Sequence, residues 1–168
     1  MALSLYDLSI PVFLRGLHQL SHLLDKGLAH ATAAGIDTAT LVNARLAPDM
    51  YTLAGQVQGA SDASKLGSAR LAGVTAPSFP DTETTYAELQ ARVAKTIDYL
   101  NTLERAQVDG FENRAVVMKS RGNEVQFTAQ RYLLQFALPN FFFHVTTAYD
   151  VLRHSGVPIG KMDYLGKF

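Results

Sequence analysis

Long stretches of this chain carry apolar residues at helical spacing, and this periodicity limits the fold more than any other feature of the sequence. The first stretch runs from Pro11 to about Ala34. At about 100° per residue, its large apolar side chains share one arc of roughly 80° on the helix surface. A long amphipathic helix is therefore predicted, with a core stripe of Phe13, Leu17, Leu20, Leu24 and Leu28.

Three further segments also follow helical spacing. The second is expected over residues 48–72, because Pro48 suits the first turn of a helix and a glycine follows its end. The third begins after Asp81 or Thr82, either of which is a good N-terminal cap. The last is expected over residues 139–155, opened by a proline and ended by a glycine.

Between the third and last helices the pattern changes from helical to alternating. In AVVMKSRGNEVQFT, β-branched residues stand on either side of a Gly-Asn turn, which favours a β-hairpin. Thr128 then offers a cap for a short helix, AQRYLLQFA. Four long helices with a small hairpin predict an all-α fold, an antiparallel four-helix bundle. Since no internal repeat or low-complexity linker divides the chain, we expect one domain over residues 1–168.

The composition excludes several classes of function. Lys plus Arg and Asp plus Glu are equal at 15 each, so the chain has no electrostatic footprint for a nucleic acid or an anionic membrane. The absence of cysteine excludes disulfides, a thiol nucleophile and thiolate metal sites. The N-terminal segment lacks the basic start and uninterrupted apolar run of a signal peptide. We therefore expect a cytoplasmic protein with neither nucleic acid nor membrane as a partner.

The histidines are the first candidates for chemistry. His18 and His22 have the i, i+4 spacing of a metal-binding pair, but they lie roughly 120° and 160° from the apolar stripe, so we expect a solvated helix face. His144 lies only about 80° from the core stripe of the last helix and should be half-buried. Asn140, one turn earlier, lies on the same side. Two interpretations of His144 remain open. It lines a pocket, or it is a structural histidine whose ring nitrogens bond to neighbouring polar groups.

Three consecutive phenylalanines precede His144 and must face different surroundings. Phe141 points into the core, whereas Phe143 lies about opposite the core stripe. A large aromatic residue on the outer face of a helix indicates either cover by another segment or a partner surface. We expect cover by the hairpin region, and dimerisation is the alternative.

Several segments also resemble a known family. LAPDMYTLAGQVQGASD, SARLAG, LPNFFFHVTTAYDVLRHSGV and PIGKMDYLG are similar to the bacterial domain-of-unknown-function family DUF1993, within the DinB/YfiT-like helical-bundle superfamily. The resemblance implies an antiparallel four-helix bundle, often a homodimer. It also implies kinship with proteins that hold a divalent metal with three histidines, some of which transfer low-molecular-weight thiols such as bacillithiol or mycothiol.

The resemblance also assigns positions to the metal site of the superfamily. Its metal-binding members have one histidine in the second helix and a pair separated by three residues in the fourth. Aligned through LRHSGV, His144 matches the later member of that pair and Asn140 occupies the earlier position. The second helix offers Gln56, Gln58 and Asp62 instead of a histidine. Amide oxygens are weak zinc ligands, and a harder ion held through Asp62 is the alternative.

Two functional hypotheses follow. The first is a homodimeric DinB-like protein that binds a small molecule in an interior pocket at His144, Asn140, Gln58 and Asp62, without the full three-histidine metal site. The second is an enzyme that depends on a divalent metal ion, such as a low-molecular-weight thiol transferase, with His144 as a metal ligand or general base. The two hypotheses differ in whether a stoichiometric divalent ion is required.

Overall fold

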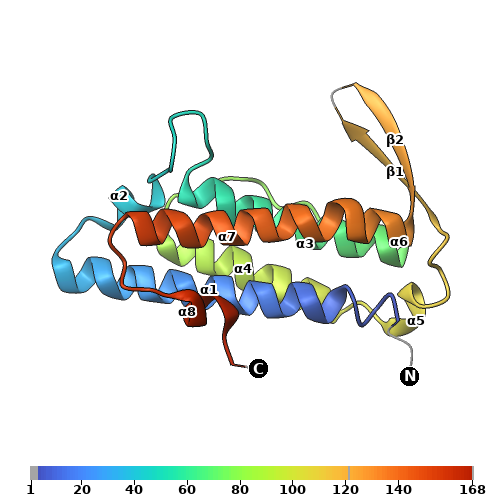
Figure 1. Cartoon of the computed structure of the whole chain (residues 1–168), viewed down its shortest axis with the longest axis horizontal. Coiled ribbons are helices and arrows are strands. Elements are labelled where there is room, and N and C mark those ends of the chain that lie inside the picture. Colours follow the sequence, from blue (N-terminus) through green and yellow to red (C-terminus); the bar gives the residue numbers. More distant parts are fainter. Residues whose placement is uncertain (1–3, 121, 168) are drawn as a thin grey trace.

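The structure is a computed structural model that describes residues 4–120 and 122–167, and it shows a mostly helical chain with one small hairpin (Figure 1). Its longest helices are α1 (Ile10–Ala34), α3 (Leu53–Ala72), α4 (Tyr86–Asn101) and α7 (Leu138–His154). Helix α3 packs against α4 and α7, and α1 packs against the same two helices, so the core lies between the four. The predicted mostly helical architecture is confirmed. Within the described ranges, no helix is long and apolar enough to cross a membrane.

The four long helices are not all antiparallel to their neighbours. Phe13 packs on Phe141 and Gly27 lies against Leu152, so α1 and α7 run parallel. Helices α3 and α4 also run parallel, because the connection 73–85 returns along α3 before α4 begins (Figure 1). The pairs α3–α7 and α1–α4 are antiparallel. The sequence predicted the order of the four long helices along the chain. It did not predict that the connection 73–85 crosses the length of the molecule.

The core stripe of α1 differs from the predicted one near the C-terminal end of the helix. Its first four members are fully buried, as expected. The fifth, Leu28, is 39% exposed, so that part of the prediction is wrong. Because an α-helix repeats every 3.6 residues rather than every four, Gly27 and Ala31 face the core in its place.

Two helices begin later than predicted, and side-chain caps explain both differences. Helix α3 does not begin at Pro48, because the Thr52 hydroxyl accepts a hydrogen bond from a first-turn amide at 3.2 Å and fixes the start there. Helix α4 is not capped by Asp81 or Thr82. Instead, Thr85 forms a reciprocal capping box with the glutamate three residues later. The segments before α3 and α4 are therefore longer connections than the sequence indicated.

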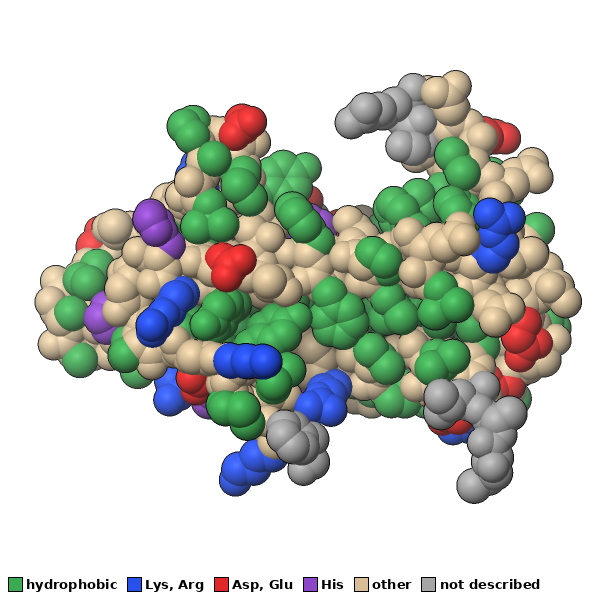
Figure 2. Space-filling view, viewed as in Figure 1, with side chains coloured by type: hydrophobic (Ala, Val, Ile, Leu, Met, Phe, Trp, Pro, Cys, Tyr) green, Lys and Arg blue, Asp and Glu red, His purple; other side chains and the backbone are tan. Residues whose placement is uncertain are grey.

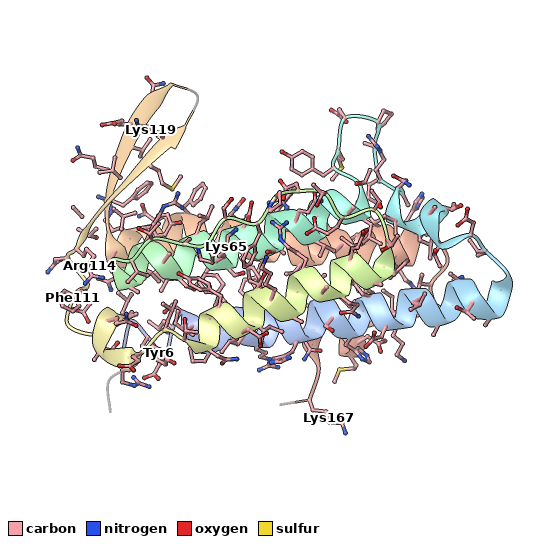
Figure 3. The ribbon with its side chains drawn as sticks, turned by 180° about the vertical axis from the view of Figure 1, so that it is seen from behind. Tyr6, Lys65, Phe111, Arg114, Lys119 and Lys167 are labelled. Carbon is pink, nitrogen blue, oxygen red and sulfur yellow. The ribbon has the colours of Figure 1, made fainter. Side chains whose placement is uncertain are left out.

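The predicted hairpin is confirmed. Strand β1 (Ala115–Ser120) pairs antiparallel with β2 (Asn123–Thr128), while Arg121, in the expected turn, lies outside the described residues. The hairpin projects from the helices, and Lys119 near its tip lies away from them (Figure 3). It therefore does not cover Phe143, which is 56% exposed, and the expectation of cover within the chain is wrong.

The final helical segment is continuous, although the sequence predicted a break. Helix α6 (Ala129–Tyr132), capped by Thr128 as expected, leads through a π-helical turn, η1 (Leu133–Ala137), directly into α7. Proline lacks an N–H and its ring crowds the preceding turn, so the wider π turn before Pro139 accommodates it without breaking the helix. The short helices α2 (Thr38–Val42), α5 (Arg105–Val108) and α8 (Lys161–Leu165) complete the fold.

Candidate functional site

A groove lies between α3 and α7, on the side from which the loop 44–52 and the hairpin project (Figure 1). Its volume is about 540 Å³. The space-filling outline is hollowed between these two projections (Figure 2). All four residues predicted from the sequence line this groove, Gln58 and Asp62 from α3 and Asn140 and His144 from α7. The fold thus brings them together, while their role in binding stays a prediction.

His144 approaches α3 closely because residue 59 is a glycine. A Cβ atom placed on Gly59 would lie only 2.6–2.8 Å from three atoms of the imidazole ring, so any larger residue would displace it. The ring is half-buried, as predicted. It lies parallel to the Tyr51 ring at a centroid distance of 6.4 Å, and the Phe143 ring meets it edge-on at 5.5 Å. Aromatic neighbours on two sides restrict how the imidazole can turn.

A hydrogen bond to a buried amide selects the tautomer of His144. Its Nδ1 lies 2.8 Å from Oε1 of Gln56, a residue that is 1% exposed. Because a carbonyl oxygen can only accept, Nδ1 carries the proton and donates. Burial also lowers the pKa of His144 from its ordinary value of 6.5, which favours the neutral ring at pH 7. Nε2 is therefore the nitrogen that can accept a hydrogen bond from a ligand.

We predict that His144 titrates below pH 6.5 and is an Nδ1–H tautomer above it. Since its pKa is lowered on folding, the folding stability linked to this ring is complete above 6.5 and is lost as the pH falls toward the folded-state pKa. Nitrogen-detected NMR of the imidazole ring measures both properties. The Gln56→Leu variant is the control, because it removes the acceptor and should abolish the tautomer preference. A wild-type ring protonated on Nε2 at pH 7.5 would contradict the assignment.

Asp62 is paired with two buried cations. Its Oδ1 lies 2.8 Å from Lys65 Nζ and 3.0 Å from Arg92 Nη2, and these two cationic side chains are only 4% and 1% exposed. An Asp–Lys pair at i, i+3 on a helix is usually solvent-exposed, but here the lysine is buried. The connection 73–85 runs back along α3 past Lys65 and covers it (Figure 3).

Arg92 ties this connection to the helices. Its guanidinium contacts Asp81 and Glu83 at 3.0 Å each, and the carbonyl of Pro80 at 3.1 Å. Burial by itself would raise the pKa of Glu83, but hydrogen bonds from Gln58 and Arg92 outweigh it and the pKa is lowered. The network therefore holds the acidic wall of the groove in place and compensates its charge.

The residues of the groove do not fit the metal site that the resemblance implies. Asp62 is already paired with two cations, which would repel a divalent ion beside it. His144 offers one nitrogen, and Asn140 and Gln58 offer weak amide ligands. Across the described part of the chain, no group of three or more His, Cys, Asp or Glu side chains could hold a metal ion. The donor set therefore gives no support to the metal-dependent hypothesis.

We predict that the purified protein retains no stoichiometric divalent metal. After dialysis against trace zinc, manganese and nickel, elemental mass spectrometry should give the same low metal content for wild type and His144→Ala, because the donor set is incomplete. A near-stoichiometric ion in wild type that is lost in His144→Ala would contradict this prediction and restore the metal-dependent hypothesis.

The other predicted histidine pair lies away from the groove. His18 and His22 are exposed, as expected from the helical wheel. His22 Nε2 lies 3.3 Å from the Asp163 carboxylate, in the C-terminal helix α8. The His22–Asp163 contact therefore helps to hold the C-terminal segment against α1.

Sequence reasoning missed several residues of the groove. Tyr51 lies in the loop before α3, and Met118 lies on the hairpin, so no helical pattern could connect them with α7. Arg70 and Tyr132 were also missed. Its Nη1 donates to the Tyr132 hydroxyl at 2.8 Å.

Comparisons with known proteins agree with this fold. The chain is similar to the crystal structure of a DinB family member protein from Shewanella denitrificans, with 40% identity and a TM-score of 0.88. The match covers 98% of this chain and 93% of that one. Among curated proteins there is no significant match. The model of the family described as domain of unknown function DUF1993 matches residues 5–165. Since that match spans nearly the whole sequence, the chain belongs to the DUF1993 family.

Proposed function

We propose that this protein binds a small organic molecule in the groove between α3 and α7. The observation that carries the proposal is the groove itself, about 540 Å³ in volume and lined by apolar and polar side chains together. Small-molecule sites typically combine a mostly apolar wall with a few polar groups that fix orientation. Here the polar groups are Gln58, Asn140 and the neutral ring of His144.

The shape of the groove is built into the fold. One wall is α3, where Gly55 and Gly59 let Tyr51 and His144 pack close to the helix backbone, and the other wall is α7. The buried cations Lys65 and Arg92 hold Asp62 in place, and the buried amide of Gln56 holds His144, before any ligand arrives. Preorganised groups lose less conformational entropy on binding, so this arrangement supports a binding role.

A variant with a filled groove tests the proposal. Ala63 lines the groove, and the indole of Ala63→Trp should fill part of it, whereas Ala94→Trp on the exposed face of α4 is a matched control. Organic molecules that raise the melting temperature of wild type should also stabilise the control, but not the filled variant. Equal stabilisation of all three proteins, or of none by a broad metabolite panel, would count against the groove.

We also infer that the chain forms a homodimer through the outer face of α7. Phe143 is 56% exposed on the side of α7 opposite its core stripe. A separate apolar groove of about 510 Å³, lined in part by Phe142, lies between α7 and α1. Apolar side chains are visible between these two helices (Figure 2). The charge of the chain permits self-association, because equal numbers of acidic and basic residues leave two copies without net repulsion.

Sedimentation velocity tests the dimer. Wild type should sediment as a dimer and Phe143→Ser should shift toward monomer, since removing an exposed aromatic residue from an interface core weakens association. Val117→Ser, which removes a 48% exposed apolar residue from the hairpin, is the control and should remain dimeric. A monomeric wild type would refute the inference.

A further inference from the structure

Arg70 is a half-buried cation at one end of the groove between α3 and α7. Its guanidinium donates to the Tyr132 hydroxyl at 2.8 Å and lies 5.6 Å from the centre of that ring. Among residues 4–120 and 122–167, no carboxylate lies within ion-pair distance of Arg70, whereas the other buried cations, Lys65 and Arg92, are both paired. Most of the five N–H donors of Arg70 are thus free for a ligand.

The groove beside Arg70 is apolar. Leu66, Phe136 and Ala137 line it, and the rings of Phe136 and Tyr132 stack with centroids 5.9 Å apart. Met118 reaches the same space from the hairpin. A guanidinium with free donors can bind a carboxylate with two parallel hydrogen bonds. A molecule held at Arg70 must therefore carry an apolar body next to its acidic group.

The opposite end of the groove presents hydrogen-bond acceptors. His144 leaves Nε2 as an acceptor because Nδ1 donates to Gln56. Gln58 donates its amide nitrogen to Glu83 at 2.9 Å, which leaves its oxygen as an acceptor. Arg70 lies three turns further along α3 than the glycine beneath His144, a separation of about 16 Å at 1.5 Å per residue. A hydroxyl or amine at the far end of a ligand would match these acceptors.

We propose that the ligand is an organic monocarboxylate with an elongated apolar body and a hydroxyl or amine at its far end. The carboxylate binds Arg70, the apolar body lies along Leu66 and Phe136, and the terminal donor reaches Nε2 of His144. This inference rests on the proposed binding function and adds the chemical class of the ligand.

Isothermal titration calorimetry with three straight-chain probes tests the class: ω-hydroxydecanoate, decanoate and the uncharged decanamide. For wild type, decanoate should bind about tenfold or more tightly than decanamide, because a charge-assisted pair is lost in the amide. The ω-hydroxy probe should bind more tightly than decanoate. Arg70→Gln should remove the preference for carboxylate, and Arg70→Lys should keep part of it. Arg131→Gln, on the exposed face of α6 outside the groove, is the control and should behave as wild type.

The outcomes separate this inference from the binding function. If decanamide binds as tightly as decanoate, or if Arg131→Gln loses as much as Arg70→Gln, the carboxylate assignment is wrong while the groove remains a binding site. If decanoate binds and ω-hydroxydecanoate binds no more tightly, the assignment of a hydrogen-bond donor at the far end of the ligand is wrong. If no probe binds wild type and the panel above finds no ligand that distinguishes Ala63→Trp from Ala94→Trp, the binding function itself fails.

Discussion

Replacing Phe141 by alanine should lower the free energy of unfolding by about 3–5 kcal/mol, since it deletes a large aromatic side chain from a packed core. The side chain is fully buried, its ring meets that of Phe13 edge-on with centroids 5.1 Å apart, and it fills the space left by Gly16. The surrounding helices cannot close this space without moving α1 and α7 together. Chemical denaturation followed by circular dichroism measures the loss.

The same run of three phenylalanines supplies the control. Phe143 is 56% exposed in the monomer, so at protein concentrations low enough for wild type to be monomeric, Phe143→Ala should change the unfolding free energy by less than about 0.5 kcal/mol. Both variants remove the same atoms from the same helix, and only their burial differs. Equal losses for Phe141→Ala and Phe143→Ala would show that the described packing of α7 is wrong.

Arg92→Ala should be the second most damaging change, with a loss of about 2–3 kcal/mol in unfolding free energy. Its side chain is 1% exposed and compensates Asp62, Asp81 and Glu83, which are 36%, 55% and 13% exposed. The alanine variant leaves these carboxylates without their shared cation. We expect a smaller loss of unfolding free energy than for breaking a fully buried ion pair, because the Asp62 and Asp81 carboxylates can be solvated by water. Arg105→Ala is the control and should lose much less, because Arg105 is 53% exposed and its ion pairs with Asp7 and Asp109 are open to solvent.

The pH dependence of this loss identifies its cause. Because the pKa of Glu83 is lowered in the folded protein, its contribution is complete above the ordinary value of 4.5 and is lost as the pH falls through the folded-state pKa. The difference in stability between wild type and Arg92→Ala should therefore shrink below pH 4.5. A difference that stays constant down to pH 3 would mean that lost packing, rather than charge, explains the effect.

Part of the candidate site could be predicted from helical geometry and part only from the family resemblance. The helical wheel places His144 and Asn140 at the margin of the α7 core stripe. Gln58 and Asp62, one turn apart on α3, were candidates because the resemblance implies a ligand in the second helix. The structure shows all four around one groove. The wheel did not show that Lys65 is buried, because the covering segment 73–85 has no periodic pattern of its own. It also could not show that Gly59 makes room for the imidazole ring.

The sequence by itself determined the helices, the hairpin and the faces of the helices that meet the core, because each depends on residues a few positions apart. Only the tertiary structure decided which helices run parallel, and which groups bind the polar residues of the groove. Those partners are far apart in the chain: Gln56 is 88 positions from His144, and Asp62 is 30 positions from Arg92. Local spacing carries no information about such pairs, because the path of the connecting segments brings them together.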